Sequence, residues 1–323
     1  KELELTIALT NYCNFSCVYC YQNKNEKLMT TEVANMIIEK IDRILNDNIF
    51  EGINIHYFGG EPLLNIPVLI YLDENIKKIT DKIGIVYKAF LTTNGSMLSK
   101  ELLQKVKFSS IQLTFDGLEK THDRLRVSDH FHFKEEIELI ENIMNFSQAK
   151  VLLRTNICKE NKDEIIALHK YIFEKFGNER IEINPNRTIK YHQDDSFEML
   201  SVQEYAEVAY QIKLLWSEQK GKFELPVPRS TPCKFPYGNA YAISPEGYCT
   251  FCSGSMDQEK KYFFDVDIEN KKMFSVRKEC KKCNILPLCL GGCIIQYNLR
   301  AGACTYEKYE LKNILISYIK HIS

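Results

Sequence analysis

The sequence predicts an α/β fold: a parallel sheet whose strands alternate with helices, followed by a cysteine-rich segment. Six strand-like segments alternate with helix-like segments between residue 1 and Pro185. After Pro185 the alternation stops, and eight of the twelve cysteines follow it. Such alternation builds a parallel sheet, either open or closed into a partial barrel, and these sheets bind ligands at the C-terminal ends of their strands. Functional residues are therefore expected in the loops that follow the strands.

The first two elements show the patterns clearly. Leu3–Thr10 has strand-like composition, and Thr31–Asp47 carries apolar residues at helical spacing. Further strands are expected at Ile53–Phe58, Ile85–Thr92, Ile111–Phe115, Val151–Ile157 and Arg180–Asn184. Further helices are expected at Val68–Thr80, Leu98–Val106, Lys134–Phe146 and Asp163–Phe176.

The chain changes character after Pro185. A polar stretch, Asn186–Phe197, precedes a helical pattern at Val202–Lys220 whose apolar stripe is expected to pack in the core. The Ser-Pro-Glu-Gly sequence at 244–247 indicates a hairpin, and Tyr306–Ile319 indicates a closing helix. These changes divide the chain into a barrel-like part at 1–185, a bridging loop and helix at 186–232, a cysteine-rich part at 233–304 and a C-terminal helix at 305–323.

Charge and hydropathy disfavour two classes of partner. The 323 residues include 42 Lys and Arg against 43 Asp and Glu, so no broad positive field would attract nucleic acid or an anionic membrane. No apolar run approaches the roughly 18 residues that span a bilayer, and the N-terminus has no signal-peptide pattern. A cytoplasmic protein with neither a nucleic-acid partner nor a membrane partner is expected.

The cysteines fall into two groups that indicate metal binding. Three lie near the start, eight lie between Cys233 and Cys304, and Cys158 stands alone. In a cytosolic chain, thiols separated by short loops are more naturally metal ligands than disulfides, because such loops bring them around one centre. Cys158, next to an apolar run, is expected to be a small buried residue.

The first group, Cys13, Cys17 and Cys20, directly follows the first expected strand. A four-iron cluster has four iron corners, so three local thiolates would leave one iron open to a small chelating ligand. Tetrahedral zinc is the alternative, but it needs a fourth ligand, and no further His or Cys lies nearby in sequence to supply it. An iron–sulfur cluster is the preferred interpretation.

This Cys-x3-Cys-x2-Cys loop, with the aromatic Tyr19 before its last cysteine, resembles that of the radical S-adenosylmethionine (SAM) enzymes. A second resemblance is Gly59-Gly60-Glu61-Pro62, which immediately follows the second expected strand. Paired glycines let the backbone approach a ligand closely, and a carboxylate can accept a hydrogen bond from an ammonium group. In the family this loop binds the amino group of the methionine part of SAM.

Two later loops also resemble the family pattern. Thr92-Thr93-Asn94-Gly95 follows the third expected strand, and Thr114-Phe115-Asp116-Gly117, with His122-Asp123-Arg124-Leu125-Arg126, follows the fourth. The resemblance implies that Thr114 and Arg126 hold the carboxylate and ribose side of SAM and that Asn94 supports the pocket. Thr114 stands where many members carry Ser, a change that keeps the hydroxyl. The expected cofactor-binding residues are thus Tyr19, Gly59, Gly60, Glu61, Asn94, Thr114 and Arg126.

The second cysteine group is similar to the seven-cysteine C-terminal domain called SPASM, which holds two auxiliary four-iron clusters. Its spacing is Cys233-x13-Gly247-x4-Cys252, then Cys280-x2-Cys283-x5-Cys289-x3-Cys293, then Cys304. The resemblance implies that Cys280, Cys283, Cys289 and Cys304 bind the distal cluster, and that Cys233, Cys252 and Cys293 bind the cluster nearer the active site. Together the two resemblances imply a partial (β/α)6 barrel with a C-terminal SPASM domain.

Cys249 lies outside the seven-cysteine pattern. On an extended strand, positions 249 and 252 face opposite sides, which argues against joint ligation unless the hairpin bends there. Either Cys249 or an upstream residue completes the nearer cluster, which is one thiolate short, or that cluster keeps an open iron and Cys249 packs. Zinc ribbons are the alternative for the Cys-x2-Cys pair.

The resemblance implies an enzyme with three [4Fe–4S] clusters and SAM. The first cluster, once reduced, would split SAM into methionine and a 5′-deoxyadenosyl radical that abstracts hydrogen from an unreactive carbon. Members with this extension mostly modify peptides, so the expected function is maturation of a ribosomally made peptide by a thioether or carbon–carbon crosslink. The expected partners are that peptide and an external one-electron reductant of the flavodoxin or ferredoxin type. The sequence leaves no room for a leader-binding module before the first strand, so leader recognition is expected to use the body of the protein, a separate leader-binding protein, or N-terminal sequence trimmed from this chain.

Three other functions are weighed against this one. A sulfatase-maturing enzyme forms formylglycine, but that subgroup has an Asp after the Gly-x4-Cys cysteine, where this chain has Ser253. A peptide epimerase needs a hydrogen-donating thiol, and Cys158 and Cys249 are the unassigned candidates. A non-catalytic iron–sulfur electron carrier would not need the Gly59–Glu61 loop.

Overall fold

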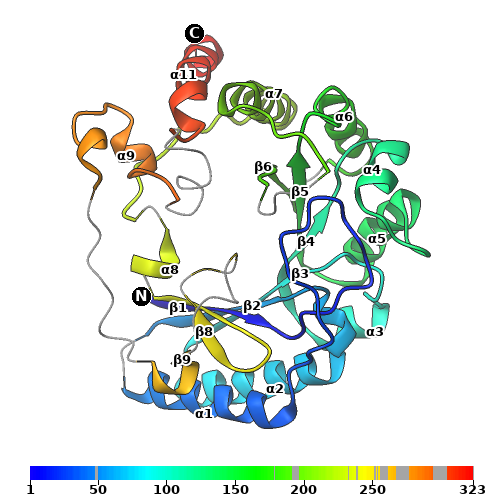
Figure 1. Cartoon of the computed structure of the whole chain (residues 1–323), viewed down its shortest axis with the longest axis vertical. Coiled ribbons are helices and arrows are strands. Elements are labelled where there is room, and N and C mark those ends of the chain that lie inside the picture. The colour runs from blue at the N-terminus through cyan, green and yellow to red at the C-terminus, as the bar shows by residue number, and fades with distance from the viewer. Residues whose placement is uncertain are drawn as a thin grey trace.

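The computed structural model describes residues 1–47, 50–177, 179–190, 196–231, 233–237, 239–250, 252, 254, 261–266, 276–293 and 304–322. The chain forms a partial (β/α)6 barrel, in which parallel strands curve around a common interior and helices cover the outside (Figure 1). The strands are β1 (Glu2–Ala8), β2 (Gly52–Phe58), β3 (Val86–Thr92), β4 (Phe108–Thr114), β5 (Lys150–Ile157) and β6 (Ile181–Arg187). The helices are α1 (Thr31–Asp47), α2 (Ile66–Ile83), α3 (Lys100–Lys105), α4 (Glu119–Leu125), α5 (Phe133–Phe146), α6 (Ile165–Phe176) and α7 (Val202–Lys220).

The hairpin of the cysteine-rich segment extends the same sheet. β7 (Ala240–Ile243) pairs in parallel with β1, and β8 (Tyr248–Thr250) and β9 (Lys261–Tyr262) follow it in antiparallel order. The sheet order is therefore β6-β5-β4-β3-β2-β1-β7-β8-β9. The C-terminal helix α11 (Glu307–Ile322) packs on α7. The other described elements are η1 (Pro62–Asn65), α8 (Lys234–Tyr237), η2 (Phe263–Asp265), η3 (Lys278–Cys280) and α9 (Leu286–Cys289).

The expected elements agree with the structure, and the differences have physical causes. Helices α1 and α7 have the predicted bounds, and the predicted turn joins β7 to β8. Helix α4 is absent from the predicted elements because two of its three buried residues, Thr121 and His122, are polar and hide the apolar periodicity. β9 is two residues long, too short for any periodicity to show.

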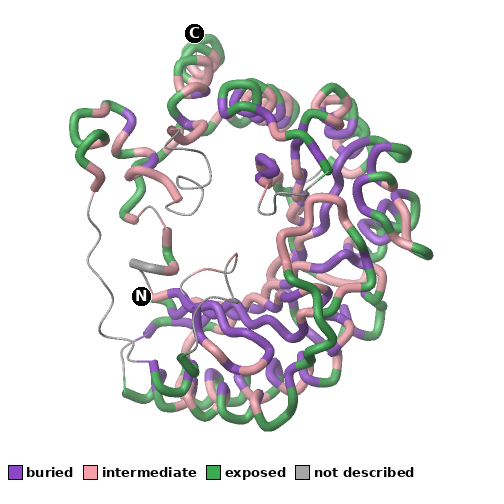
Figure 2. The backbone as a smooth tube through the Cα atoms, in the orientation of Figure 1, coloured by how far each residue is buried: buried purple, intermediate pink, exposed green. Residues whose placement is uncertain are grey.

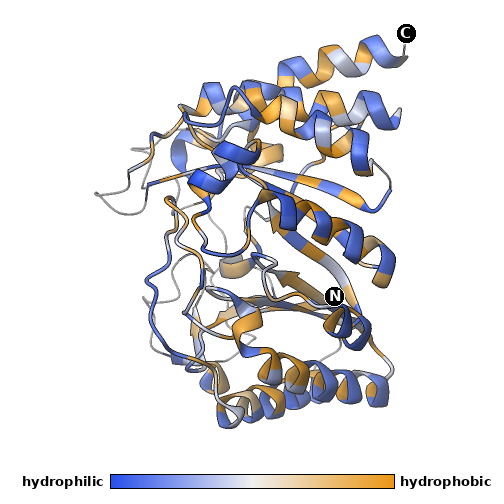
Figure 3. Ribbon diagram, turned by 90° about the vertical axis from the view of Figure 1, so that its right-hand side faces the viewer, coloured by the Kyte–Doolittle hydropathy of each residue, from blue (hydrophilic) through white to orange (hydrophobic). Residues whose placement is uncertain are grey.

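Alternation along the strands separates an apolar outer face from a polar inner face. On β1, Leu3, Leu5 and Ile7 are buried and pack in the core under the helices. The inner face instead presents polar side chains such as Gln112 and Arg154 to a cavity. Figure 2 shows the buried strands enclosed by helices whose outer surfaces are exposed, and Figure 3 shows hydrophobic stripes on these helices. Among the described helices, none is long and apolar enough to cross a membrane.

Helix α7 covers the free edge of β6. Its apolar stripe packs in the core as predicted, with Trp216 buried. The Tyr205 hydroxyl donates a hydrogen bond to the Pro185 carbonyl, and the Lys220 ammonium donates one to the Ile181 carbonyl, each at 2.8 Å. Pro185 itself has no N–H to offer. These contacts pair the edge groups of β6 and protect the strand from pairing with another chain.

Candidate active site

The C-terminal ends of the barrel strands open into a cavity of about 490 Å³. Its lining includes the three cysteines of the first group and two cysteines of the second, Cys252 and Cys293. It also includes six of the seven expected cofactor-binding residues: Tyr19, Gly59, Gly60, Asn94, Thr114 and Arg126. The structure therefore brings together residues that are separated by up to 280 positions in sequence (Cys13 to Cys293).

The loop after β1 carries Cys13, Cys17 and Cys20 on one wall of the cavity. Two backbone hydrogen bonds anchor it to the end of α4, from Ser16 N to Val127 O at 2.8 Å and from Val18 N to Leu125 O at 3.0 Å. All three thiols are partly exposed. The donor set consists of soft sulfur ligands, which suit iron–sulfur clusters or zinc. Among the described residues, no three Cys, His, Asp or Glu side chains converge closely enough to hold a single metal ion.

Burial raises the pKa of the Cys17 thiol to about 11 and also raises the pKa of Cys13. The dominant cause is loss of solvent around the charged form, partly offset at Cys17 by the positive charge of Arg126. Metal binding requires thiolates, so it must displace these protons. Cys13 and Cys17 are therefore neutral thiols at neutral pH until a metal centre binds.

The two glycines of the loop after β2 are required by the cysteine loop. Gly60 N donates to Thr10 O and Glu61 N donates to Tyr12 O, each at 2.9 Å. A Cβ atom on Gly59 would lie 2.3 Å from Thr10 O, and one on Gly60 would lie 2.2 Å from Tyr12 O. Glycine is needed at positions 59 and 60 because any side chain there would collide with the backbone of the cysteine loop. The expectation that these glycines allow close approach to a ligand therefore describes only part of their role.

The Glu61 carboxylate is fully buried and bound by protein groups. Oε1 accepts hydrogen bonds from Thr93 Oγ1 at 2.6 Å and from Leu63 N at 3.0 Å, and Oε2 accepts one from Asn94 N at 2.6 Å. Burial raises the pKa of Glu61, against the opposing effect of these three donors. A ligand ammonium group would have to compete with these donors for the carboxylate. Through these hydrogen bonds, Glu61 links the loop after β2 to the loop after β3.

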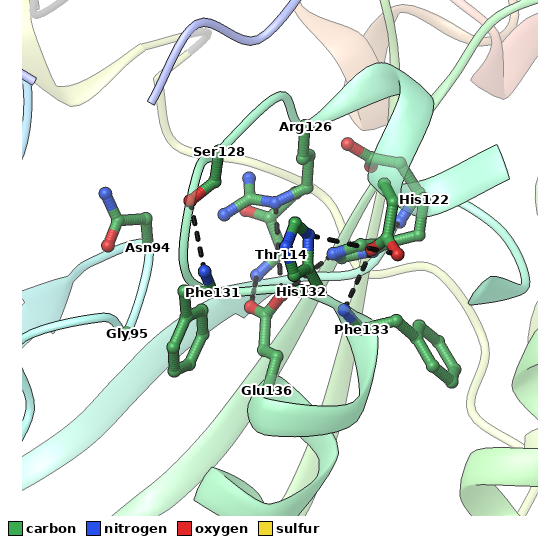
Figure 4. A network of polar contacts seen from close by, with 12 residues as sticks. Asn94, Gly95, Thr114, His122, Arg126, Ser128, Phe131, His132, Phe133 and Glu136 are labelled. Atoms are coloured by element: carbon green, nitrogen blue, oxygen red, sulfur yellow. Dashed lines mark hydrogen bonds and ion pairs between the residues drawn. The ribbon is translucent and has the colours of Figure 1, made fainter. Parts of the chain in front are cut away.

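A second buried carboxylate, Glu136 of α5, organises the loop after β4 (Figure 4). Glu136 Oε1 accepts a hydrogen bond from Thr114 N at 3.2 Å. Its Oε2 lies 3.2 Å from His122 Nε2 and 3.9 Å from Arg126 Nε. Glu136 is absent from the predicted site. The signal for it was an acidic residue on the buried stripe of α5, next to Ile137 and Ile140.

Arg126 is the described cavity residue best suited to bind an anion. It is buried, and its Nε and Nη2 have no hydrogen-bond partner among the described residues. Its guanidinium lies 5.3 Å from the centre of the Phe15 ring. The nearby charge of Glu136 raises the pKa of Arg126 despite burial, so the side chain stays cationic. Unpaired donors in a buried guanidinium fit a carboxylate ligand, as the resemblance implies.

Tyr19 joins the cysteine loop to β4 and β5. Its hydroxyl donates a short hydrogen bond to Asp116 Oδ2. Asp116 Oδ1 accepts a bond from Asn156 N at 2.7 Å, and the Asp116 carbonyl accepts one from Asn161 Nδ2 at 2.9 Å. Burial raises the pKa of Asp116 and of Tyr19. The Tyr19 hydroxyl thus serves the protein framework, while its side chain contributes to the cavity wall.

Asn94 supports the cysteine loop directly. Its Nδ2 donates to Asn14 Oδ1 at 2.8 Å and lies 3.9 Å from Cys13 Sγ, within hydrogen-bond range of a sulfur acceptor. Its Oδ1 accepts from Ser96 Oγ at 2.7 Å. The side chain therefore holds the first cysteine and its neighbour in place.

Other polar residues of the cavity wall, among them His56, Gln112, Arg154 and Asn156, belong to no motif identified in the sequence. His56 Nε2 lies 2.7 Å from Thr92 Oγ1, and burial lowers the pKa of His56 to about 4, so the imidazole is neutral. Arg154 Nε donates to Asn156 Oδ1 at 2.9 Å. These side chains come from alternate positions of β2, β3 and β5, and only the curvature of the sheet brings them together. A smaller cavity of about 320 Å³ continues below and shares His56 and Gln112.

The second cysteine group splits between the cavity and the C-terminal segments. Cys252 and Cys293 line the cavity, whereas Cys233 does not appear in its lining. Cys280 ends η3, Cys289 ends α9, and Cys283 lies in the segment between them. Thr305, which follows Cys304, packs against Gly292, where an added Cβ would lie 2.2 Å from Thr305 Cγ2. The four cysteines expected to bind a distal cluster thus lie on two neighbouring segments of the fold. Ser253 lies outside the described residues.

Cys249 and Cys158 lie away from the cavity. Cys249 is 3% exposed and packs in the main core, whereas Cys252, which lies beyond the end of β8, lines the cavity. Cys158 is fully buried among Leu125 and Phe197, as expected for a small buried residue, and burial raises its pKa to about 12. Neither thiol lines the space where a substrate would bind, so the hydrogen-donor role considered for them is not favoured by their positions.

Sequence comparisons agree with these motifs. The family described as "Radical SAM superfamily" matches residues 7–172, half of the chain. The radical SAM cyclopropyl synthase TigE of Paramaledivibacter caminithermalis is 24% identical over 98% of this chain and 74% of its own length. A GTP 3′,8-cyclase of Clostridium perfringens is 31% identical, and an uncharacterized protein of Methanocaldococcus jannaschii is 34% identical. The chain spans only 51% and 39% of the length of these last two relatives.

Solved structures show the same fold along the whole chain. The sulfatase-maturase structure anSMEcpe, with bound AdoMet and the Cp18Cys peptide, superposes with a TM-score of 0.73 at 19% identity and covers 100% of this chain and 98% of its own. SuiB of Streptococcus suis, bound to its precursor peptide SuiA, superposes with a TM-score of 0.66 at 17% identity over 92% of this chain and 72% of its own. The matched residues 7–172 contain the first cysteine group, the Gly59–Glu61 loop, Thr114 and Arg126. The chain therefore belongs to the radical SAM superfamily.

Proposed function

We propose that this chain is a radical SAM peptide maturase that crosslinks a ribosomally made peptide. One observation carries the proposal: the cavity is lined both by Cys13, Cys17 and Cys20 and by Cys252 and Cys293. Metal centres on both walls would put hydrogen abstraction and electron removal on either side of one substrate-sized space. Two structural neighbours contain peptides, Cp18Cys and SuiA, which supports a peptide as substrate.

In this proposal the first cysteine group holds a [4Fe–4S] cluster and SAM. When bound there, they supply radical abstraction of hydrogen from an unreactive carbon. The Arg126 guanidinium would bind the carboxylate of SAM through Nη2, which has no hydrogen-bond partner among the described residues, while Nε faces Glu136. Thr114, Gly59 and Gly60 also line the cavity, where the Thr114 hydroxyl and the glycine backbone would hold other polar groups of SAM.

We further propose that the C-terminal part holds two auxiliary clusters. Cys233, Cys252 and Cys293 bind the cluster nearer the cavity, and Cys280, Cys283, Cys289 and Cys304 bind the distal one. In this division residues 1–185 form the radical SAM barrel, 186–232 bridge it to the SPASM domain at 233–304, and 305–323 form the closing helix. An external reductant of the flavodoxin or ferredoxin type supplies the electron.

Formylglycine formation is the second candidate. It is favoured by the similarity to anSMEcpe, whose TM-score of 0.73 is higher than that of 0.66 for SuiB. The absence of an Asp at position 253 weighs against it. The GTP 3′,8-cyclase relatives point to another substrate, but the match shown covers only 52% of this chain.

Mass spectrometry of a candidate precursor peptide, incubated with the reduced and reconstituted enzyme in heavy water, distinguishes these functions. A crosslink removes two hydrogens and lowers the mass by about 2 Da per bond, as radical chemistry at two centres requires. Formylglycine reacts with hydrazine reagents, and an epimerised residue takes up deuterium. The matched control replaces Cys13, Cys17 and Cys20 with Ala, which should abolish the product. An aldehyde product would replace crosslinking with formylglycine formation as the function.

A further inference from the structure

The cysteines expected to bind the distal cluster accept hydrogen bonds from charged side chains. Arg277 Nη2 lies 3.7 Å from Cys280 Sγ, and Lys308 Nζ lies 3.8 Å from Cys304 Sγ. Gly291 N adds a neutral donor to Cys289 Sγ at 3.4 Å. Three of the four expected distal ligands thus have a donor directed at sulfur, and two of these donors carry a full positive charge.

The first cysteine group has a different set of donors. The two donors to Cys13 Sγ are the Phe15 N–H at 3.4 Å and the Asn94 side-chain amide at 3.9 Å, both neutral. A cationic donor is electrostatically stronger than a neutral one at the same distance, because its net charge acts in addition to its dipole. The side-chain donors directed at Cys280 and Cys304 thus carry a net charge, whereas the two donors to Cys13 do not.

Arg277 is fixed in position by the surrounding chain. Its Nη2 also donates to the Gly291 carbonyl at 2.6 Å, and its Nε lies 3.6 Å from Glu279 Oε1. The side chain is 27% exposed, so solvent screens its charge only in part. Arg277 lies just before η3, and its side chain reaches Cys280 at the end of η3 and Gly291 in the turn after α9. Lys308, at the start of α11, is exposed by contrast.

We infer that Arg277 and Lys308 raise the reduction potential of the distal cluster through their charged hydrogen bonds to Cys280 and Cys304. The inference rests on the proposed function, which assigns that cluster to Cys280, Cys283, Cys289 and Cys304. One-electron reduction adds one negative charge to the cluster and its thiolates, and a cation hydrogen-bonded to sulfur stabilises that charge. Hydrogen bonds to sulfur and net charge are two of the factors that set such potentials. The electron is exchanged with the external one-electron carrier of the proposed function, and no bond is formed or broken and no proton is transferred.

The experiment uses the full-length chain with Cys13, Cys17 and Cys20 replaced by Ala, reconstituted with iron and sulfide. Only the two auxiliary clusters then remain, with about eight irons per chain. A redox titration followed by electron paramagnetic resonance measures their two midpoint potentials. The variants are Arg277→Gln, which keeps an amide donor but removes the charge, Arg277→Lys, which keeps the charge, and Lys308→Met. The matched controls, Lys278→Gln and Lys312→Met, each remove a nearby exposed charge without a thiol contact.

Arg277→Gln should lower one midpoint potential by at least a tenfold change in the reduction equilibrium, about 59 mV for a one-electron couple. Arg277→Lys should stay closer to the parent. Lys308→Met should produce a smaller shift that vanishes at about 1 M salt, where the screening length falls to about 3 Å. The controls should leave both potentials unchanged.

Two failures can be told apart. The inference would be overturned if the protein bound about eight irons and the midpoint potentials of Arg277→Gln and Lys308→Met equalled those of their controls. That result would leave the two auxiliary clusters of the proposed function in place. A parent that binds no iron once the first three cysteines are replaced would instead refute the auxiliary clusters of the proposed function. If Arg277→Gln does not fold, the low-salt shift of Lys308→Met, on an exposed side chain, decides the question.

Discussion

Glu61 Oε2 accepts a 2.6 Å hydrogen bond from the backbone N–H of Asn94, and this bond joins the loop after β2 to the loop after β3. Asn94 in turn contacts the first cysteine through its side chain. The position of the cysteine loop thus depends on a carboxylate that is itself fully buried. Substitutions at Glu61 should therefore disturb the packing of these loops, whether or not Glu61 contacts a ligand.

Glu61→Gln should therefore reduce stability as well as SAM binding. The amide keeps one acceptor oxygen but places an NH2 group opposite a donor, so at least one buried donor loses its partner, at a cost of about 1–3 kcal/mol. Denaturant unfolding of the iron-free protein measures this loss. Thr93→Val is the matched variant, because it removes one of the three bonds and keeps the carboxylate. Unchanged stability with lost SAM binding would show instead that Glu61 meets the ligand directly.

Gly60→Ala should destabilise the protein by at least about 2 kcal/mol, since the added Cβ meets the Tyr12 carbonyl at 2.2 Å and neither backbone can move freely. Gly84→Ala is the control. Gly84 has φ of +83° but no atom within 4 Å of the added Cβ, so only the backbone strain of about 1 kcal/mol applies. Thermal unfolding of both variants compares steric contact with strain. Equal losses would mean that the two loops are not packed as described.

Arg126→Gln should weaken SAM binding about 10- to 150-fold, which corresponds to the loss of a charge-assisted hydrogen bond worth about 1.5–3 kcal/mol. Iron content should not change, because Arg126 binds no metal in the proposal. Arg126→Lys is the control, because it keeps a positive charge beside Glu136. It separates the loss of SAM binding from the effect of leaving the buried Glu136 carboxylate without a cation. Calorimetric titration of SAM into the reconstituted enzyme provides the measurement. Parent-like affinity in both variants would remove Arg126 from the binding site.

The iron-free protein should become less stable as the pH rises above about 9. The pKa of Cys17 is raised from 9.0 to about 11 by burial, so the folded state holds this proton more tightly than the unfolded chain does. The resulting contribution to stability is complete below pH 9 and is lost as the pH approaches 11. Unfolding free energies at pH 8 and pH 10.5, for the parent and for Cys17→Ala, test this. The pH-dependent loss should be smaller in the variant, and identical profiles would contradict the assignment.

Cys249→Ala and Cys252→Ala should have opposite signatures. Cys249 packs in the core, so its loss should cost about 1–2 kcal/mol of stability and no iron. Cys252 lines the cavity, so its loss should lower iron content with little effect on the core. Iron analysis after reconstitution, together with thermal unfolding, compares them. Loss of iron in Cys249→Ala would restore Cys249 as a ligand.

The alternation of strands and helices was predictable because each buried element repeats its apolar residues at a fixed period. The three-cysteine loop and the Gly59–Glu61 loop were predictable because the residues that define each motif are close together in sequence. The contacts that fix them were not, since Tyr19 and Asp116 lie 97 positions apart and meet only through the barrel. The same holds for Glu136, whose acidic side chain on an apolar helix face had no visible partner in the sequence. Periodicity reveals which face of an element is buried but not which distant group it meets.

The pairing of β7 with β1 has a consequence for how the chain is made. β1 carries the cysteine loop, yet its second neighbour is built more than 230 residues later, as the register of Glu4 with Ala240 shows. Until that segment leaves the ribosome, β1 presents an open strand edge beside an apolar core, the kind of surface that captures other chains. Truncation before residue 240 would make that exposure permanent, so fragments containing only the barrel should aggregate where the full chain does not.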